Sequence, residues 1–400
     1  MAAVTGVLFL SSCAASPAAQ PAAGSWEQIS SDARGQTVKL WMYGGDTQGN
    51  AYVDDYLVPA AAKEGVTLKR VPVADTKDAL NRVLTEKQSG TTAGQVDLVW
   101  VNGDNFGTGK AAGAWACGWT SLLPNMGLTN PSDPLLSEDF GTPVDGCEAP
   151  WSKAQFTIAY NSAAVPEPPK TLAGLLDWVK EHPGRFTYPA PPDFTGSVFT
   201  REVLYSVSGG YTKVPLACDL GAFDGLTPAL VTELQDLKPS LWREGSTYPK
   251  SSSELNALYA GGQVDFTMTY GPAELTKLVT DGTYPAATKV LTLDEGTVGN
   301  ASFLGIPSTS GHRSAAMVVA NLALSEEQQA RKADPGIWGQ FPVLNPGALS
   351  PEGRALFGRL PSSPVVPGYE VLSKNANHEL AAAWVSALDE LWRRQILAGK

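Results

Sequence analysis

Residues 94–101, Gly-Gln-Val-Asp-Leu-Val-Trp-Val, are the most informative stretch of the chain, because residues 262–269, Gly-Gln-Val-Asp-Phe-Thr-Met-Thr, repeat the pattern. Each stretch is an apolar run typical of a strand, and each follows a segment with helical spacing that contains a Leu-Asn pair, at 80–81 and at 255–256. Two helix-to-strand units about 170 residues apart predict two α/β lobes of related design. The match covers few letters, so the assignment also depends on the surrounding segments.

The segments around these two units alternate between strand and helix patterns. Val38–Met42 predicts a strand that stops at the turn 44–46, and the strand over 96–101 stops at the polar turn 102–105. Two further strands are predicted, at 156–161 and at 304–307, and we expect the first of them to cross between the lobes. The predicted helices are 78–88, 171–182, 198–206, 253–259, 314–324 and 381–397. Thr171 is the expected cap of its helix, and one more helix is predicted to begin with the capping box Ser325–Gln328.

The N-terminus has the features of a bacterial lipoprotein signal. Residues 10–13, Leu-Ser-Ser-Cys, end an apolar stretch that begins at Val4, and a Pro/Ala/Ser-rich tract follows at 14–25. This pattern predicts cleavage before Cys13 and a lipid on that cysteine, although no Lys or Arg precedes the apolar stretch. The alternative is an Ala/Ser-rich, disordered N-terminus that contains a cysteine by chance. The lipidated interpretation makes 1–35 a signal and tether and places the protein on the outer face of the cell membrane.

Composition excludes several classes of function. The formal charge of −11 disfavours nucleic acid, because phosphate binding needs clustered Lys and Arg. Apolar residues make up 43% and charged residues 17%, which is a globular balance, and no apolar run approaches the ~20 residues that span a bilayer. We therefore expect contact with the membrane only through the N-terminal lipid.

The residues that a catalytic site would need are largely missing. The three histidines are far apart in the sequence and lack metal-ligand spacing, and no Gly-x-Ser-x-Gly nucleophile motif occurs. Residues 104–111 resemble a phosphate loop, but Asp104 replaces its first glycine and Ala111 its metal-binding hydroxyl. We expect no enzyme, no metal and no cofactor. A secreted hydrolase that uses a pair of carboxylates on a carbohydrate or small ester remains the alternative, and a purely structural lipoprotein is a third.

Two of the remaining cysteines flank one loop-rich region. Cys117 and Cys147 are separated by several prolines, and an exported location permits a disulfide between them. Cys218 would then be free or buried. The alternative is three unpaired thiols in the interior.

Seven segments in order resemble the substrate-binding proteins of bacterial ABC importers, and in particular the YnjB-like branch. They are 41–46, 96–106, 186–199, 264–272, 295–307, 325–328 and 332–335, and together they span most of 36–345. No single segment is a strong motif; their order and spacing carry the resemblance.

The resemblance implies an α/β, periplasmic-binding-protein-like (type II) fold, with two lobes joined by crossing strands and a ligand cleft between them. The implied organisation is 36–157 for the first part of lobe 1, 158–292 for lobe 2, 293–345 for the return to lobe 1, and 346–400 for C-terminal helices packed on the lobes. It further implies a monomer outside the cytoplasm that captures a small molecule, closes through a hinge near 160–161 and 295–305, and delivers its ligand to the transmembrane subunits of an ABC permease.

The resemblance also gives roles to polar and aromatic residues at the ends of predicted strands and the starts of helices. In lobe 1 the expected ligand-binding residues are Tyr43, Gly44, Gly45, Asp46, Trp100, Asn102, Asp104 and Asn105. In lobe 2 and near the second crossing they are Tyr188, Asp193, Thr195, Gly196, Ser197, Tyr270 and Asn300, with the backbone N–H groups of 195–197 offered to an anionic or accepting group.

Each of these residues also has a purely structural interpretation. The turn at 44–46 can be only a turn, Thr195 and Ser197 can be only a helix cap, and Asp104 can be a solvated acid. Tyr188, Tyr270 and Trp100 can be core aromatics.

Aromatic rings beside carboxylates suit a cation. The expected ligand is therefore an organic cation, thiamine-like or an amine, while the predicted helix start at Gly196 leaves a sugar or a phosphorylated molecule open. Iron is disfavoured, because related iron sites use neighbouring tyrosines and this chain has no Tyr-Tyr pair.

Overall fold

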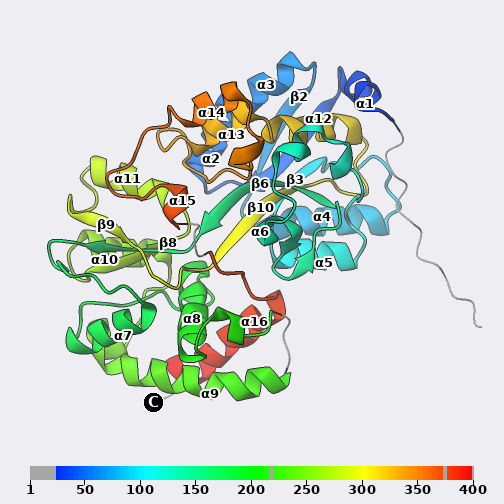
Figure 1. Ribbon diagram of the computed structural model, residues 1–400. Coiled ribbons are helices and arrows are strands. Elements are labelled where there is room, and N and C mark those ends of the chain that lie inside the picture. The colour runs from blue at the N-terminus through cyan, green and yellow to red at the C-terminus, as the bar shows by residue number, and fades with distance from the viewer. Residues whose placement is uncertain (1–23, 217–219, 373–375, 399–400) are drawn as a thin grey trace, which may run out of the picture.

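Strand β3 (Leu98–Val101) lies in the middle of a five-stranded sheet in the computed structural model, which describes residues 24–216, 220–372 and 376–398. The strand order is β2 (Thr67–Val73), β1 (Thr37–Tyr43), β3, β10 (Gly299–Gly305), β6 (Glu148–Gln155). Strand β1 pairs in parallel with β2 and β3, so the carboxyl ends of all three strands lie at one edge of the sheet, whereas β10 runs antiparallel to β3 and β6. We call this sheet and the helices around it lobe 1 (Figure 1).

Both faces of the lobe 1 sheet are covered. Alternate side chains of β1 are buried in a core shared with α1 (Trp26–Ala33) and α12 (Arg313–Ala323), while Val99 and Val101 of β3 face α4 (Thr76–Gln88) and α5 (Asp104–Ala111). The same lobe also holds α2 (Thr47–Tyr52), α3 (Val58–Lys63), α6 (Pro134–Ser137), β4 (Glu138–Asp139), β5 (Thr142–Pro143), α13 (Glu326–Ala333) and α14 (Pro351–Phe357).

Lobe 2 is built on a smaller antiparallel sheet with the order β8 (Phe266–Thr269), β7 (Thr157–Asn161), β9 (Thr288–Leu291). Helix α8 (Phe194–Val207) is almost completely buried in its core, where Phe199 packs against Phe186. The other helices of this half are α7 (Leu172–Glu181), α9 (Leu220–Leu237), α10 (Ser252–Ala260), α11 (Ala273–Thr280), α15 (Tyr369–Leu372) and α16 (Ala382–Trp392). The two helix-to-strand units predicted from the sequence are α4–β3 in lobe 1 and α10–β8 in lobe 2.

The chain crosses between the sheets at Phe156, between β6 and β7, and again between β9 and β10. The two crossings are hydrogen-bonded to each other, because the Phe156 N–H donates to the Val298 carbonyl at 2.8 Å. We call residues 155–157 and 297–299 the hinge. The expected position of the first crossing at Tyr160–Asn161 was wrong: both residues pair inside the lobe 2 sheet, with β8 or β9 as partners.

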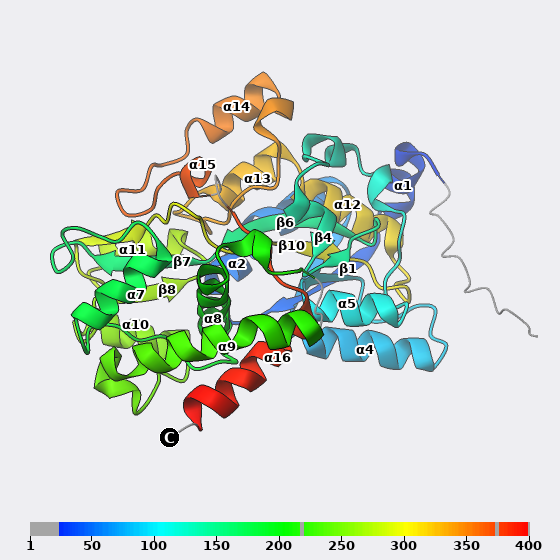
Figure 2. The ribbon, with the colours of Figure 1, turned by 60° about the horizontal axis from the view of Figure 1, so that its bottom comes forward.

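The end of the chain contacts both lobes. Helix α14 packs on α13 in lobe 1, and the chain then reaches lobe 2, where Ser363 bonds Thr276. In the C-terminal segment, 376–398, Asn377 pairs with the hinge through Thr297 and Gly299. Helix α16 then packs against α8, and Figure 2 shows it beside α9 at the bottom of lobe 2. None of the helices within the described ranges is long and apolar enough to cross a membrane.

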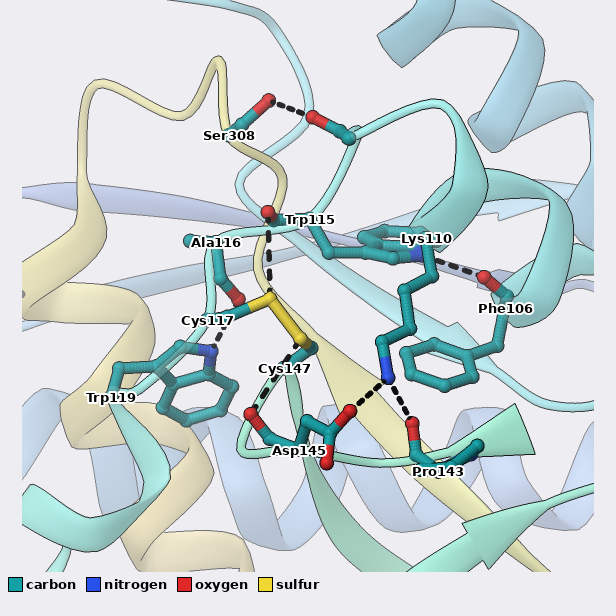
Figure 3. The surroundings of a disulfide bond; sticks show 11 residues. Phe106, Lys110, Trp115, Ala116, Cys117, Trp119, Pro143, Asp145, Cys147 and Ser308 are labelled. Atoms are coloured by element: carbon teal, nitrogen blue, oxygen red, sulfur yellow. Dashed lines mark hydrogen bonds and ion pairs between the residues drawn. A yellow bond between two sulfur atoms is a disulfide. The ribbon is translucent and has the colours of Figure 1, made fainter. Parts of the chain in front are cut away.

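A disulfide joins Cys117 to Cys147, the pairing that the sequence analysis expected. It links the loop after α5 to the residue just before β6. Figure 3 shows Lys110 of α5 reaching Asp145 beside the disulfide, with an Nζ–Oδ2 distance of 2.6 Å. The bond therefore fastens the helix that begins with Asp104 to the edge of the lobe 1 sheet.

Replacing both cysteines by serine should destabilise the protein by about 3–4 kcal/mol. The disulfide closes a loop with a sequence separation of 30, and removing such a cross-link returns that loop-closure entropy to the unfolded chain. Urea unfolding of C117S/C147S, compared with the wild type, measures the difference; Cys218 lies outside the described residues. A double variant as stable as the wild type would contradict a structural role for the bond.

Candidate functional site

The turn after β1 presents one carboxylate, Asp46, at the edge of lobe 1. Its Oδ1 accepts the Gly49 N–H at 2.8 Å, which caps α2, and its Oδ2 accepts the indole N–H of Trp338 at 2.8 Å. Two fixed donors hold the carboxylate in one orientation while the residue stays partly exposed. Asp46 is therefore a preorganised anionic group rather than a mobile surface acid.

The glycines of this turn are required by close packing. A Cβ on Gly45 would lie 2.2 Å from the Tyr43 hydroxyl, and a Cβ on Gly44 would lie 2.9 Å from the Pro72 side chain. Tyr43 therefore folds back over Gly45, with 47% of its surface exposed. Gly44 and Gly45 let this aromatic ring lie next to Asp46.

An aromatic group extends this edge to the neighbouring strand. Trp100 of β3 is partly exposed, and its ring meets Trp151 and Trp338 edge to face, with centroid distances of 5.5 and 5.7 Å. Because Trp338 also bonds Asp46, it joins the turn after β1 to β3.

The turn after β3 is held by a buried acid. Gly103 has a φ of +62°, and its N–H donates to both carboxylate oxygens of Asp139 at 2.7 and 2.8 Å. The expected residues Asn102 and Asn105 are partly exposed there, and Asp104 is exposed in the first turn of α5.

Lobe 2 contributes an aromatic pair and an acid. Tyr270 follows β8 and packs edge to face on Phe194, with 4.8 Å between ring centroids. Phe194 is 45% exposed although it is the first residue of α8. Glu274 lies in the first turn of α11.

Two observations connect these parts of lobe 1 and lobe 2. The pKa of Glu274 is raised by partial burial and by the negative charge of Asp46, so the two carboxylates lie near each other although they belong to different lobes. The lobes also come close at Gly271 of lobe 2 and Gln340 of lobe 1, where a Cβ on Gly271 would lie 4.0 Å from the Gln340 amide nitrogen. We take Tyr43, Asp46 and Trp100 in lobe 1 and Phe194, Tyr270 and Glu274 in lobe 2 as the candidate site.

Four residues expected to form the lobe 2 half of the site have internal partners instead. Asp193 caps α8 by accepting the N–H groups of Thr195 and Gly196 on its side chain and the Ser197 N–H on its carbonyl, and its carboxylate also accepts bonds from Ser252. The three N–H groups that were expected to face a ligand therefore already have partners. Thr195 is 5% exposed. A Cβ on Gly196 would lie 1.9 Å from the Pro189 carbonyl oxygen. We therefore leave Asp193, Thr195, Gly196 and the neighbouring Ser197 out of the candidate site, and their role in ligand binding stays a prediction.

Ser197 and Tyr188 belong to the interior of lobe 2. The Ser197 hydroxyl donates to Asp389 and accepts a bond from Arg201 at 2.7 Å. Tyr188 is fully buried, with its hydroxyl bonded to the indole N–H of Trp392 at 2.9 Å. Both residues stabilise the packing of α16 on lobe 2, so Tyr188 is also left out of the candidate site.

Asn300 lies near the crossing, as expected, but is only 6% exposed in β10. It lines a cavity of about 20 Å³ together with Asp139 and His378, which has room for about one water molecule. We do not include Asn300 in the candidate site.

The sequence analysis missed Phe194, Glu274 and Trp338. A signal existed for Glu274, because it opens the helix after the repeated strand, just as Asp104 opens the helix after β3. No local pattern distinguished Trp338, whose role depends on a hydrogen bond to a residue 292 positions away.

Comparisons with known proteins agree with this architecture. The family model "Bacterial extracellular solute-binding protein" matches residues 51–354. Protein YnjB of Escherichia coli K12 is 38% identical over 375 residues, which cover 92% of this chain and 93% of YnjB.

Solved structures share the fold at low sequence identity. An ABC transporter structure from Clostridium perfringens aligns with a TM-score of 0.64 and 19% identity over 90% of this chain and 98% of that one. The spermidine/putrescine ABC transporter substrate-binding protein PotD from Streptococcus pneumoniae aligns with a TM-score of 0.62 and 16% identity, over 91% of this chain and 100% of that one. The expected two-lobed, type II periplasmic-binding fold is thereby confirmed.

The two lobes joined by a paired hinge, the family match over most of the chain and the relationship to YnjB lead to one assignment. This chain belongs to the family of bacterial extracellular solute-binding proteins and has the fold of the substrate-binding components of ABC importers.

Proposed function

We propose that this receptor captures an organic cation, thiamine-like or an amine, between lobe 1 and lobe 2 and delivers it to an ABC permease. The proposal rests on two carboxylates of different lobes, Asp46 and Glu274, because the negative charge of Asp46 adds to burial in raising the pKa of Glu274. Two like charges repel when the lobes approach. A cation placed between them removes this repulsion and favours the closed arrangement.

The aromatic side chains around the two acids support the same ligand class. Tyr43 and Phe194 are nearly half exposed, and Trp100 is partly exposed. Ring faces attract ammonium and quaternary nitrogen by about 0.5–2 kcal/mol each, depending on desolvation. The acidic formal charge of −11 also favours the approach of a cation. PotD, named for spermidine and putrescine, shares only the fold, so the amine proposal rests on the side chains of this chain.

We further propose that the receptor acts as a monomer, tethered to the outer face of the membrane by a lipid on Cys13. Cys13 and the rest of the leader lie outside the described residues. The proposed lipid anchor is supported by the lipoprotein-like sequence before Ala14 and by the extracytoplasmic role of the family.

A thermal-shift screen tests the ligand class. We expect quaternary amines, primary amines or thiamine-like cations to raise the melting temperature, because a ligand at 100 times its Kd stabilises the folded state by about 2.7 kcal/mol. Neutral isosteres of each hit and simple anions serve as controls. A screen in which only sugars or phosphates raise the melting temperature would contradict the proposed class, and turnover of a screened compound would favour the hydrolase alternative.

A further inference from the structure

The backbone of the second crossing is anchored by a buried side chain of α8. The Val298 N–H donates to Glu202 Oε1 at 2.6 Å, while the Val298 carbonyl accepts the Phe156 N–H from the first crossing. The hydroxyl of Tyr270, which belongs to the candidate site, donates to the same carbonyl at 3.4 Å. Both polar groups of Val298 are thus held from lobe 2, directly before β10 enters the lobe 1 sheet.

Glu202 has no cation of its own among the described residues. It is 3% exposed, and the neighbouring Arg201 forms a buried ion pair with Glu379 of the C-terminal segment at 2.7 Å. The other groups around Glu202 are the carboxylates of Glu379 and Glu295 and the phenols of Tyr205 and Tyr270. A negative charge on Glu202 would therefore face two other carboxylates, with Arg201 already paired.

A pocket lies beside the buried Glu202. Glu202 lines a pocket of about 660 Å³ together with Tyr205, Asp294 and Glu295. The side chain itself is buried, so the carboxyl exchanges its proton when the structure around it opens.

We propose that Glu202 is the positioning residue of the hinge: its neutral carboxyl fixes the second crossing at Val298, and its ionisation favours release of this contact. The consequence of this anchor is that the stiffness of the hinge, and hence the movement of the lobes, depends on the external pH. Only this consequence rests on the proposed receptor function. The anchor itself can be tested without any ligand.

The direction of the pH effect follows from the pKa of Glu202. Burial, with Glu379 and Glu295 adding to it, raises this pKa from 4.5 to about 8, against the opposing effects of the Val298 N–H and Arg201. An opened hinge that hydrates the side chain restores a pKa near the ordinary value. Between these two values the anchored state binds more protons than the opened state, so opening becomes easier as the pH rises from about 5 to 8 and levels off above that.

Hydrogen–deuterium exchange of the full-length protein measures this opening. After correction for intrinsic exchange rates, we expect protection of peptides that contain residues 297–299 to fall by up to tenfold per pH unit between about pH 5 and 8 in the wild type. Glu202→Gln keeps an acceptor oxygen and cannot ionise. Its hinge should stay as protected across this range as the wild-type hinge is near pH 5.

Asp139→Asn is the matched control. Asp139 is also buried, also accepts a backbone N–H, and has a pKa raised by burial to about 7, but it holds the Gly103 turn of lobe 1. D139N should keep the wild-type hinge profile. Equal pH profiles for the wild type and E202Q, or a flat profile in D139N, would overturn the inference. Failure of the cation screen would leave this result unaffected, so the two proposals fail independently.

Discussion

Glu274→Gln is expected to weaken the binding of a singly charged organic cation by about 10- to 100-fold. The substitution keeps the size of the side chain and removes one of two carboxylates that approach each other across the lobes. Losing one partner of a desolvated charge pair typically costs 2–5 kcal/mol, and the lower end of this range applies because Glu274 is exposed on one side. Isothermal titration of the variant with the best cation from the screen measures the change.

Asp46→Asn should have an effect at least as large, because Asp46 is held by fixed donors and cannot move away from the ligand. The substitution also affects lobe 1 itself, because the single oxygen of an amide cannot replace both carboxylate oxygens as acceptors for Gly49 and Trp338. Glu274→Gln is therefore the cleaner test. Glu64→Gln, an exposed acid at the end of α3, changes the net charge equally and should leave affinity unchanged. Equal affinities in E274Q and E64Q would show that Glu274 does not contact the cation.

Glu379→Ala is expected to lower the free energy of unfolding by about 3–5 kcal/mol. Arg201 and Glu379 are 1% and 3% exposed, and their side chains meet twice, at 2.7 Å from Nε to Oε1 and at 2.8 Å from Nη2 to Oε2. Removing Glu379 leaves the Arg201 guanidinium buried without its counterion, and an uncompensated buried charge strongly destabilises the folded state. Chemical unfolding measures the loss.

The control for this prediction is an exposed pair. Glu327→Ala removes the partner of Arg331 on the surface of α13, where the two side chains are 57% and 42% exposed, and it should change stability by less than about 1 kcal/mol. A similar small change in E379A would mean that the buried ion pair does not hold the C-terminal segment on lobe 2.

Local patterns in the sequence were sufficient for most elements and for the turn that contains Asp46. Thr171 and Ser325 cap helices α7 and α13 as expected, because an N-cap depends on residues within one turn. The turn with Asp46 was found for a similar reason: an apolar strand that stops at Gly-Gly-Asp determines both the turn and the exposure of its acid.

Several lobe 2 residues have interior partners that come from far along the chain. Asp193, Thr195 and Ser197 have the local pattern of a helix start that could bind an anion, and nothing nearby shows that Ser252 and Asp389 already bond these residues. Tyr188 likewise looks like a site aromatic until Trp392 of the last helix is packed against it. Interior partners 57 to 204 residues away cannot be seen in a local pattern.

A crystal structure of the receptor with the best cation from the screen tests the central claim most directly. The account predicts closed lobes and density for the positive centre within hydrogen-bond or ion-pair distance of both Asp46 and Glu274, with Tyr43 or Phe194 against it. Density that contacts only one lobe, or that occupies the separate pocket lined by Phe341 and Phe357, would contradict the account.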